Sequence, residues 1–384
     1  MSSARQSSGT RPRRSKGPFL TLRPEVLRWA REYRRRTTDE VAVWLSCEVR
    51  RVEILEETGG PISAAEFERL AKNYKLPQST LAAPRVPVVP DVPQDFRTIH
   101  GNDPRLSLQT LAAIAQVQAW QQIAAELVAS DLPEVAIPVV ELSANPYQAG
   151  AAERERLRIS DDEQLQLSDP PRLFAYLRKK IERQHVAVYV VPFGKSDNVR
   201  GVSDWSQEVP AVIAVNIKEA EWTARSFTLL HEYGHLLLRR PGISDENNRN
   251  RVEAWCNRFA AAALMPEGLV RASLDINSPG VTASDVNSGA RRLGVSAQAF
   301  ALRLEELGIA PEGFFRQVVS VQGRRARAKA GGSYVNTQVF SLARNYQGAV
   351  MTALSGGRID SVGASRLLNL SPRHFGAVRA AIDR

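Results

Sequence analysis

Apolar residues recur at every third or fourth position in several stretches of the chain, the spacing that places them on one face of an α-helix. Before residue 80 this pattern predicts four short helices, over 23–35, 37–45, 48–57 and 63–74. The second opens with two threonines and two acidic residues, which are typical of a capped helix N-terminus. Four short helices in succession, two of them separated by a break at Ser46, indicate a helix-turn-helix unit.

The pattern changes in the segment 76–96, which carries five prolines and predicts an extended linker. Beyond it, apolar spacing predicts a long helix over 106–129 and another over 174–184. Two runs rich in β-branched residues, 186–193 and 209–216, then predict strands with a turn-rich segment between them. We expect the second strand to offer an edge to which an extended peptide could pair.

Helical spacing returns after the strands, first in an apolar run over 226–240. Residues 283–309 and 361–382 each predict a pair of short helices, which we interpret as packing modules rather than further DNA-binding units. The predicted fold class is multidomain and mainly α with a small β-sheet. It has an N-terminal all-α domain, a central α+β domain and a C-terminal helical region.

The composition, with 43% hydrophobic and 24% charged residues, is that of a globular protein. Charged residues interrupt every apolar stretch before the roughly 18 residues that a membrane span needs, and the N-terminus lacks an apolar signal core. We therefore expect a cytoplasmic protein with no membrane partner. The only two cysteines, Cys47 and Cys256, lie in different predicted domains, which excludes a disulfide framework and a cysteine-rich zinc site.

The net charge of +10 permits contact with nucleic acid. Much of the excess lies in a Ser-rich head over 1–20, predicted to be disordered, and in "QGRRARAKAGG" over 322–332. Solvated segments and phosphate-binding segments would have the same composition, so both interpretations stay open.

The apolar run 226–240 contains His231, Glu232 and His235 in a chain with only five histidines. Residues four apart lie one turn apart on the same helix face, so both imidazoles can reach one metal ion. Glu232 projects to the side of that face, where a carboxylate could take a proton from water at the metal. Two histidines supply only two of the three protein ligands that a catalytic zinc site needs.

Glu253, on the next predicted helix over 252–266, supplies the missing ligand. Asn257 follows four residues later on the same face, where its side-chain oxygen could accept the Nδ1–H of a ligating histidine. The alternative is a core helix whose histidines bond the backbone while Glu253 forms a salt bridge. Burial among leucines such as Leu229, Leu230 and Leu236 disfavours it, because unpaired buried polar groups are costly.

These residues resemble the ImmA/IrrE family of zinc metallo-endopeptidases. The family pattern is an HExxH helix followed by a helix with E-x-x-A-N-x-F-A and a Leu-Met-Pro ending. Here it reads "HEYGH" over 231–235 and "EAWCNRFA" over 253–260, followed by "LMP". Cys256 stands where the family usually has Ala, and Tyr233 stands where Leu is frequent. The resemblance implies a Zn2+ ion held by His231, His235 and Glu253, with Glu232 as the catalytic residue.

The resemblance extends to both ends of the chain. It implies an XRE-type helix-turn-helix domain over 21–80, a Pro-rich linker over 81–100, a peptidase domain over 101–275 and a C-terminal helical domain over 276–384. Ser46 replaces the usual turn glycine of such a DNA-binding domain, and Leu55 replaces a common Trp. Its recognition helix carries Arg50 and Arg51 among glutamates, a poor match for phosphates, so docking to DNA and docking to protein both stay open.

The resemblance implies a zinc-dependent endopeptidase that cleaves a helix-turn-helix repressor and so relieves repression of stress-response or mobile-element genes. The alternative is a DNA-binding transcriptional regulator, or the antitoxin of a toxin–antitoxin pair, in which the zinc site is structural and the partner is a toxin. Tyr233 and His185 are candidates for stabilising an oxyanion, although a core aromatic and a surface histidine are simpler roles for them.

Overall fold

The chain divides into two compact units, Met1–Pro90 and Asp91–Arg384, in a computed structural model. The structure describes residues 19–34, 36–74, 76, 81–83, 85–86, 107–128, 137–194, 199–205, 209–219, 221–239, 246–274, 280–316 and 333–383. The predicted basic head, most of the predicted linker and the basic segment 322–332 lie outside the described residues.

The described residues of the first unit include four short helices, close to where the apolar spacing predicts them. They are α1 (Pro24–Tyr33), α2 (Thr38–Leu45), α3 (Val49–Glu57) and α4 (Ala64–Tyr74). Thr37 and Glu40 form a capping box at the start of α2, which ends at Ser46 in the left-handed conformation. The unit also holds a short antiparallel sheet of β1 (Phe19–Thr21) and β2 (Pro61–Ser63), which the all-α prediction lacks.

The second unit is mainly helical around one small sheet. Its described helices include α6 (Leu108–Val128), α7 (Pro146–Arg156), α8 (Asp161–Gln166), α9 (Pro170–Glu182), α10 (Trp222–Leu238), α11 (Glu246–Leu264), α12 (Glu267–Ser273), α13 (Ala283–Leu293), α14 (Ala297–Glu306), α16 (Tyr334–Ser341), α17 (Arg344–Ser355), α18 (Ser361–Leu368), η3 (Pro372–His374) and α19 (Phe375–Asp383). Within the described residues, no helix combines the length and the apolar character needed to cross a bilayer. The predicted fold class, mainly α with a small β-sheet, is confirmed.

The sheet of the second unit has the strand order β3-β5-β4. β3 (Ala187–Val191) and β5 (Val212–Asn216) are parallel, and β4 (Gly201–Asp204) is antiparallel to β5. β4 lies in the segment that the sequence predicts to be turn-rich. The expectation that the strand over 209–216 offers a free edge is therefore wrong, because β5 is the central strand and β4 occupies the edge.

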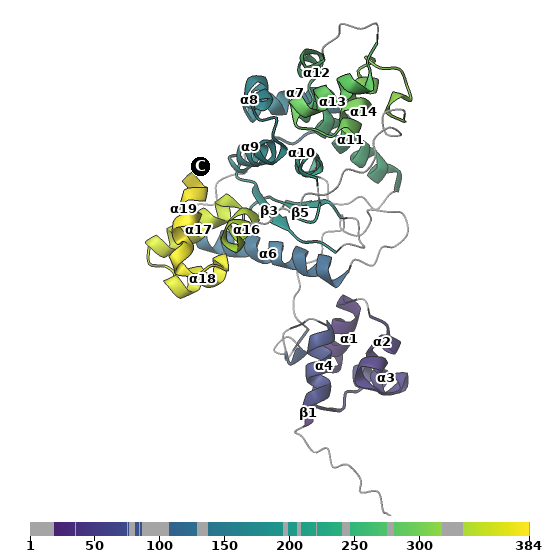
Figure 1. The fold of residues 1–384 in the computed structure, drawn as a ribbon. Helices are drawn as coiled ribbons and strands as arrows, with labels where there is room; N and C mark the ends of the chain where they lie inside the picture. Colours follow the sequence, from purple (N-terminus) through teal and green to yellow (C-terminus); the bar gives the residue numbers. More distant parts are fainter. Residues whose placement is uncertain are drawn as a thin grey trace, which may run out of the picture. The chain divides into compact units, whose positions relative to one another are not determined.

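Helices cover both faces of this sheet (Figure 1). Val188, Val190 and Ile213 face the core that contains α9, α10 and α11. Tyr189 and Ala214 face the opposite core, which contains α6 and the C-terminal helices. Strand residues therefore alternate between two apolar layers, which explains why β3 is buried at every position.

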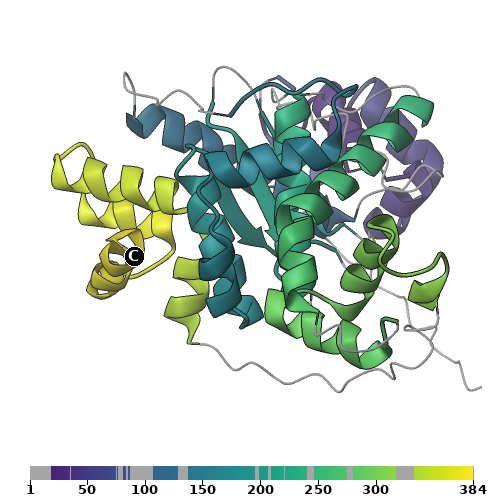
Figure 2. The ribbon, with the colours of Figure 1, turned by 90° about the horizontal axis from the view of Figure 1, so that it is seen from above.

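The last helices of the chain return to the sheet. α13 and α14 contribute Val286, Leu293 and Phe300 to the core on the α10 side. α17 and α18 contribute Tyr346 and Leu368 to the core on the α6 side. Figure 2 shows α16 to α19, in yellow-green to yellow, gathered at one side of the central helices. The region after residue 276 thus adds to both apolar layers and does not form a single core of its own.

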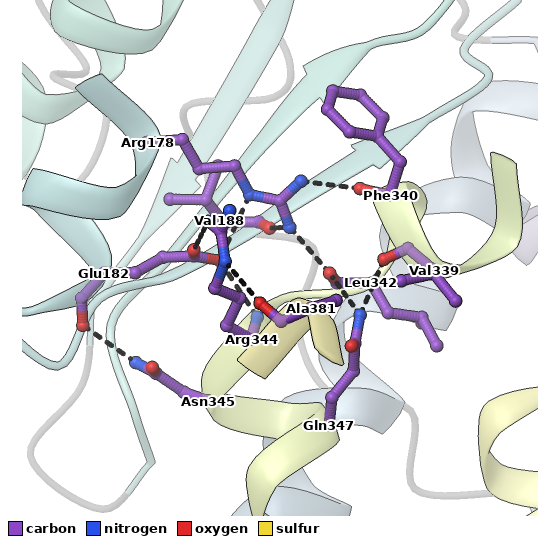
Figure 3. Close-up of polar contacts among 10 residues, drawn as sticks. All are labelled: Arg178, Glu182, Val188, Val339, Phe340, Leu342, Arg344, Asn345, Gln347 and Ala381. Carbon is purple, nitrogen blue, oxygen red and sulfur yellow. Dashed lines mark hydrogen bonds and ion pairs between the residues drawn. The ribbon is translucent and has the colours of Figure 1, made fainter. Parts of the chain in front are cut away.

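A buried ion pair on α9 fixes the C-terminal helices to the sheet (Figure 3). Arg178 bonds Glu182 at 3.1 Å and donates to the carbonyl oxygens of Val188, Phe340 and Leu342 at 2.5–2.6 Å. Glu182 also accepts from Arg344, through the backbone N–H at 3.0 Å and the guanidinium at 2.7 Å. The side chains of Arg178 and Glu182 are each only 3% exposed.

We expect Arg178→Met to lower the free energy of unfolding of the second unit by about 3–5 kcal/mol. The substitution removes one of the two arginine partners of the buried Glu182 carboxylate, leaving Arg344, and it leaves three carbonyl groups without their donor. Urea unfolding of the full chain measures this change. Arg172→Met on the same helix is the control, because that side chain is 76% exposed; it should change stability by about 0.5 kcal/mol or less. Equal effects of the two substitutions would contradict the structural role of the pair.

Candidate metal centre and general base

Helix α10 carries the two histidines and the glutamate of the HExxH sequence. It packs against β4, β5, α9 and α11, and ends where Arg239 adopts a left-handed conformation with φ of 42°. The Arg239 guanidinium lies 4.3 Å from the centre of the Trp205 ring and donates to the carbonyl of Ile137 at 2.9 Å. α10 is therefore fixed at its C-terminal end, close to the residues with metal-binding chemistry.

Gly234, between the two histidines, lets α11 approach α10 closely. A Cβ atom at this position would lie 3.1 Å from the Phe259 ring and 3.3 Å from the sulfur of Cys256. Both distances are tighter than ordinary van der Waals contact. The close approach brings Glu253 of α11 opposite the histidines of α10.

His231, His235 and Glu253 form what we call the ligand cluster. The Nε2 atoms of the two histidines lie 3.2 Å apart, and the Glu253 carboxylate oxygens lie 3.3 Å from His231 Nε2 and 3.4 Å from His235 Nε2. Three donor atoms about 2.0–2.1 Å from one tetrahedral ion would lie about 3.3 Å apart. The separations in the structure therefore fit a single zinc-sized ion.

The electrostatics of the ligand cluster favour a positive charge between its members. Burial opposes ionisation of Glu253, but hydrogen bonds from both histidines outweigh it and hold the pKa of that carboxyl far below its ordinary value. Burial likewise opposes charging of His235, but Cys256, Glu253 and Glu232 outweigh it and raise the pKa of the imidazole well above 6.5. A bound cation would replace the proton that these groups share.

The outer side of each imidazole also has a partner. The Oδ1 atom of Asn257 lies 3.0 Å from Nδ1 of His231, so it can fix the tautomer that leaves Nε2 free for a metal. The buried thiol of Cys256 hydrogen-bonds His235, and burial raises the pKa of this thiol. Cys256 stands where the similar family usually has Ala, and in the structure it interacts with the predicted ligand His235.

Glu232 turns away from the ligand cluster toward β4. Its carboxylate Oε2 accepts a hydrogen bond from the Ser203 hydroxyl at 2.8 Å, and the residue is 8% exposed. The sequence prediction missed Ser203 because it lies in the segment taken to be turn-rich. The segment "GVSD" has one β-branched residue and no clear alternation, and four residues are too few to separate a strand from a turn.

Other candidate residues lie away from the ligand cluster. The Tyr233 hydroxyl donates to Glu153 at 2.8 Å within the core and also bonds Arg156, and His185 lies in the exposed turn after α9. Neither is therefore placed to stabilise an oxyanion. In the first unit, Arg50 is 69% exposed and pairs with Glu53, whereas Arg51 pairs with Glu66 at 2.7 Å.

Comparison with known proteins gives one family match. Residues 181–305 match the family model of the IrrE N-terminal-like domain, an M78 peptidase family, over about a third of the chain. The match runs from the end of α9 through α14 and includes the whole ligand cluster. Among curated proteins, none matches the chain significantly. The family match and the ligand cluster together support a metallopeptidase-like function, and the match supports the resemblance to the ImmA/IrrE family.

We expect Glu253→Ala to abolish high-affinity zinc binding, because two imidazoles alone leave the coordination sphere short of a ligand. Zinc at 100 times its dissociation constant should stabilise the wild-type protein by about 2.7 kcal/mol, and the variant should show no such gain. Asn257→Ala should weaken zinc about 10–100-fold. Calorimetric titration measures both effects.

Glu267→Ala is the control for zinc binding, because Glu267 is an exposed glutamate on α12 that pairs with Arg271. Its affinity for zinc should equal that of the wild type. Zinc affinity that survives Glu253→Ala unchanged would exclude the ligand cluster as the metal site.

Proposed function

We propose that this protein is a zinc-dependent endopeptidase whose ion is held by His231, His235 and Glu253. The observation that carries the proposal is the mutual separation of the three donor atoms, 3.2–3.4 Å, on two helices that a glycine lets pack closely. A zinc ion bound by them would polarise the scissile carbonyl group and lower the pKa of a bound water molecule towards about 7.

Glu232 is the general base in this proposal. It adjoins His231 in sequence but bonds Ser203 rather than the ligand cluster, so its carboxylate remains available for proton transfer. It accepts the proton of the attacking water and passes it to the leaving amine. Asn257 holds His231 in the tautomer with a free Nε2.

Strand β4 is a suitable place for the substrate backbone. β4 pairs with β5 along one side and, within the described residues, pairs with no strand along the other. An extended peptide could add to this side through main-chain hydrogen bonds. Because Ser203 of the same strand contacts Glu232, a peptide on β4 would lie near the general base.

The substrate that we propose is a cytoplasmic transcriptional repressor with a helix-turn-helix fold, whose cleavage relieves repression of stress-response or mobile-element genes. Two observations support this substrate: the family match, and the helical first unit, whose sequence resembles the DNA-binding domain of such repressors. A domain of this kind can dock onto a similar domain of its substrate. We place the protein in the cytoplasm on the same grounds.

Helix α3 favours protein over DNA as the partner of the first unit. Arg51 is bound to Glu66, and Glu56 of the same helix is bound to Arg31 at 2.8 Å. Arg50, which is the more exposed arginine, lies 3.1 Å from Glu53. Paired arginines on a glutamate-rich helix neutralise few phosphates.

We expect Glu232→Gln to reduce cleavage of the repressor encoded by the neighbouring gene by at least about 10²-fold, because Gln cannot accept a proton. Its zinc affinity should match that of the wild type, since Glu232 does not belong to the ligand cluster. Mass spectrometry of purified repressor incubated with zinc and each protein measures the rate and locates the cleaved bond.

Two outcomes would contradict the peptidase proposal. Glu232→Gln could cleave as fast as the wild type, or the wild type could leave the repressor intact while zinc is bound. The second outcome would favour a regulator or antitoxin with a structural zinc site, and stable binding to a neighbouring toxin would then identify the antitoxin.

If α3 docks to protein, Arg50→Ala should leave the affinity of the full chain for duplex DNA from its own promoter unchanged. A DNA-reading α3 would instead lose affinity on this substitution, and the slope of log affinity against log salt would fall by about one. Fluorescence anisotropy at several salt concentrations separates the two. Arg172→Ala, an exposed arginine of the second unit, serves as the charge-matched control.

A further inference from the structure

The face of β4 that points to α10 is shaped around the carboxylate of Glu232. Ser203 contributes a hydroxyl that donates to Oε2 at 2.8 Å. A hydrogen bond to a charged acceptor is stronger than one between neutral groups and restricts the rotamer of the acceptor. Glu232 would otherwise keep the rotational freedom of an unbranched side chain on a helix.

Gly201 provides the space in which the Glu232 side chain lies. A Cβ atom at residue 201 would be 2.9 Å from both Cγ and Oε1 of Glu232, and 2.6 Å from the Thr228 methyl group. These distances are shorter than real Cβ contacts, so any side chain at this position would push the carboxylate away. The absence of a side chain is thus a condition for the position of Glu232.

Strand register places both residues on the same face of the sheet. Gly201 pairs with Val215 and Ser203 with Ile213, and both partners belong to the core on the α10 side. Val202 between them faces the opposite core. The strand holds Gly201 and Ser203 on a rigid element, since β4 is paired with β5 at all four of its positions.

We propose that Gly201 and Ser203 are positioning residues for Glu232: Gly201 admits its side chain beside β4, and Ser203 orients its carboxylate. This inference rests on the proposed peptidase function and goes beyond the ligand and base assignment. Strand β4 would then have two roles. Its edge that pairs with no described strand would bind the substrate backbone, and its face toward α10 would hold the Glu232 carboxylate. Small shifts of β4 would move the bound substrate backbone and the Glu232 carboxylate together.

Ser203→Ala should lower kcat for repressor cleavage about tenfold or more, with little change in KM or zinc affinity. A residue that only stabilised the fold would not separate kcat from KM in this way. Ser203→Thr, which retains the hydroxyl, should restore most of the activity. Ser226→Ala is the matched control, because Ser226 is a buried serine of α10 whose hydroxyl has no hydrogen-bond partner among the described residues. Equal kcat in Ser203→Ala and wild type would overturn the role of Ser203.

Gly201→Ala should lower kcat by about 10²-fold through displacement of the general base, while zinc still binds with wild-type affinity. Its control is Gly268→Ala, since a Cβ atom at Gly268 would meet nothing within 4 Å. Loss of zinc binding in Gly201→Ala, or wild-type kcat, would overturn the role of Gly201.

A measurement without catalysis tests the contact itself. Ser203→Ala, Glu232→Ala and the double variant of the zinc-free full chain are compared by the urea midpoint of the second unit. The two single shifts should sum to more than the shift of the double variant, because each removes the same hydrogen bond. Additive shifts would overturn the proposed contact. If the wild type cleaves nothing, the peptidase proposal fails, and the midpoints still decide whether Ser203 holds Glu232.

Discussion

The rest of the second unit depends on the close packing of α10 against α11, which brings two imidazoles and a carboxylate to one point. Although burial opposes both charges, Glu253 and His235 stabilise opposite charges on each other, which holds the pKa of the carboxyl low and raises the pKa of the imidazole. Gly234 makes this packing close enough, Asn257 contacts Nδ1 of His231, and Cys256 interacts with His235. One metal ion would satisfy His231, His235 and Glu253 at once, so the geometry has a chemical meaning beyond packing.

Helix α10 contacts α11 with one face and strand β4 with another. One face presents His231 and His235 to α11, and another presents Glu232 to β4. The sheet therefore does more than support the helix, because strand β4 contacts the Glu232 carboxylate through Ser203. The buried pair of Arg178 and Glu182 connects β3, at the opposite edge of the sheet, to the C-terminal helices.

Features that depend on residues close together in the sequence were easier to predict than features that depend on distant residues. The i, i+4 spacing of the histidines, the capping box at Thr37 and most helix positions follow from local rules, and the pattern of apolar residues predicts them well. The edge strand β4 could not be predicted, because four residues between two turns carry too little periodicity. The burial of Arg178 could not be predicted either, because a charged side chain usually lies at the surface. Arg178 is buried because it donates hydrogen bonds to three carbonyl groups that come from other segments of the chain.

The C-terminal helices pack into the second unit and are not an appendage to it. The family match ends at residue 305, before α16 to α19 begin. Yet Tyr346 of α17 lies against Tyr189 of β3, with ring centres 6.2 Å apart, and both side chains are almost fully buried. Without these helices the sheet face that carries Tyr189 and Ala214 would be open along α6, and an exposed apolar face of this kind is unstable in water. The strands that position Glu232 therefore require packing from a part of the chain that the family model does not contain.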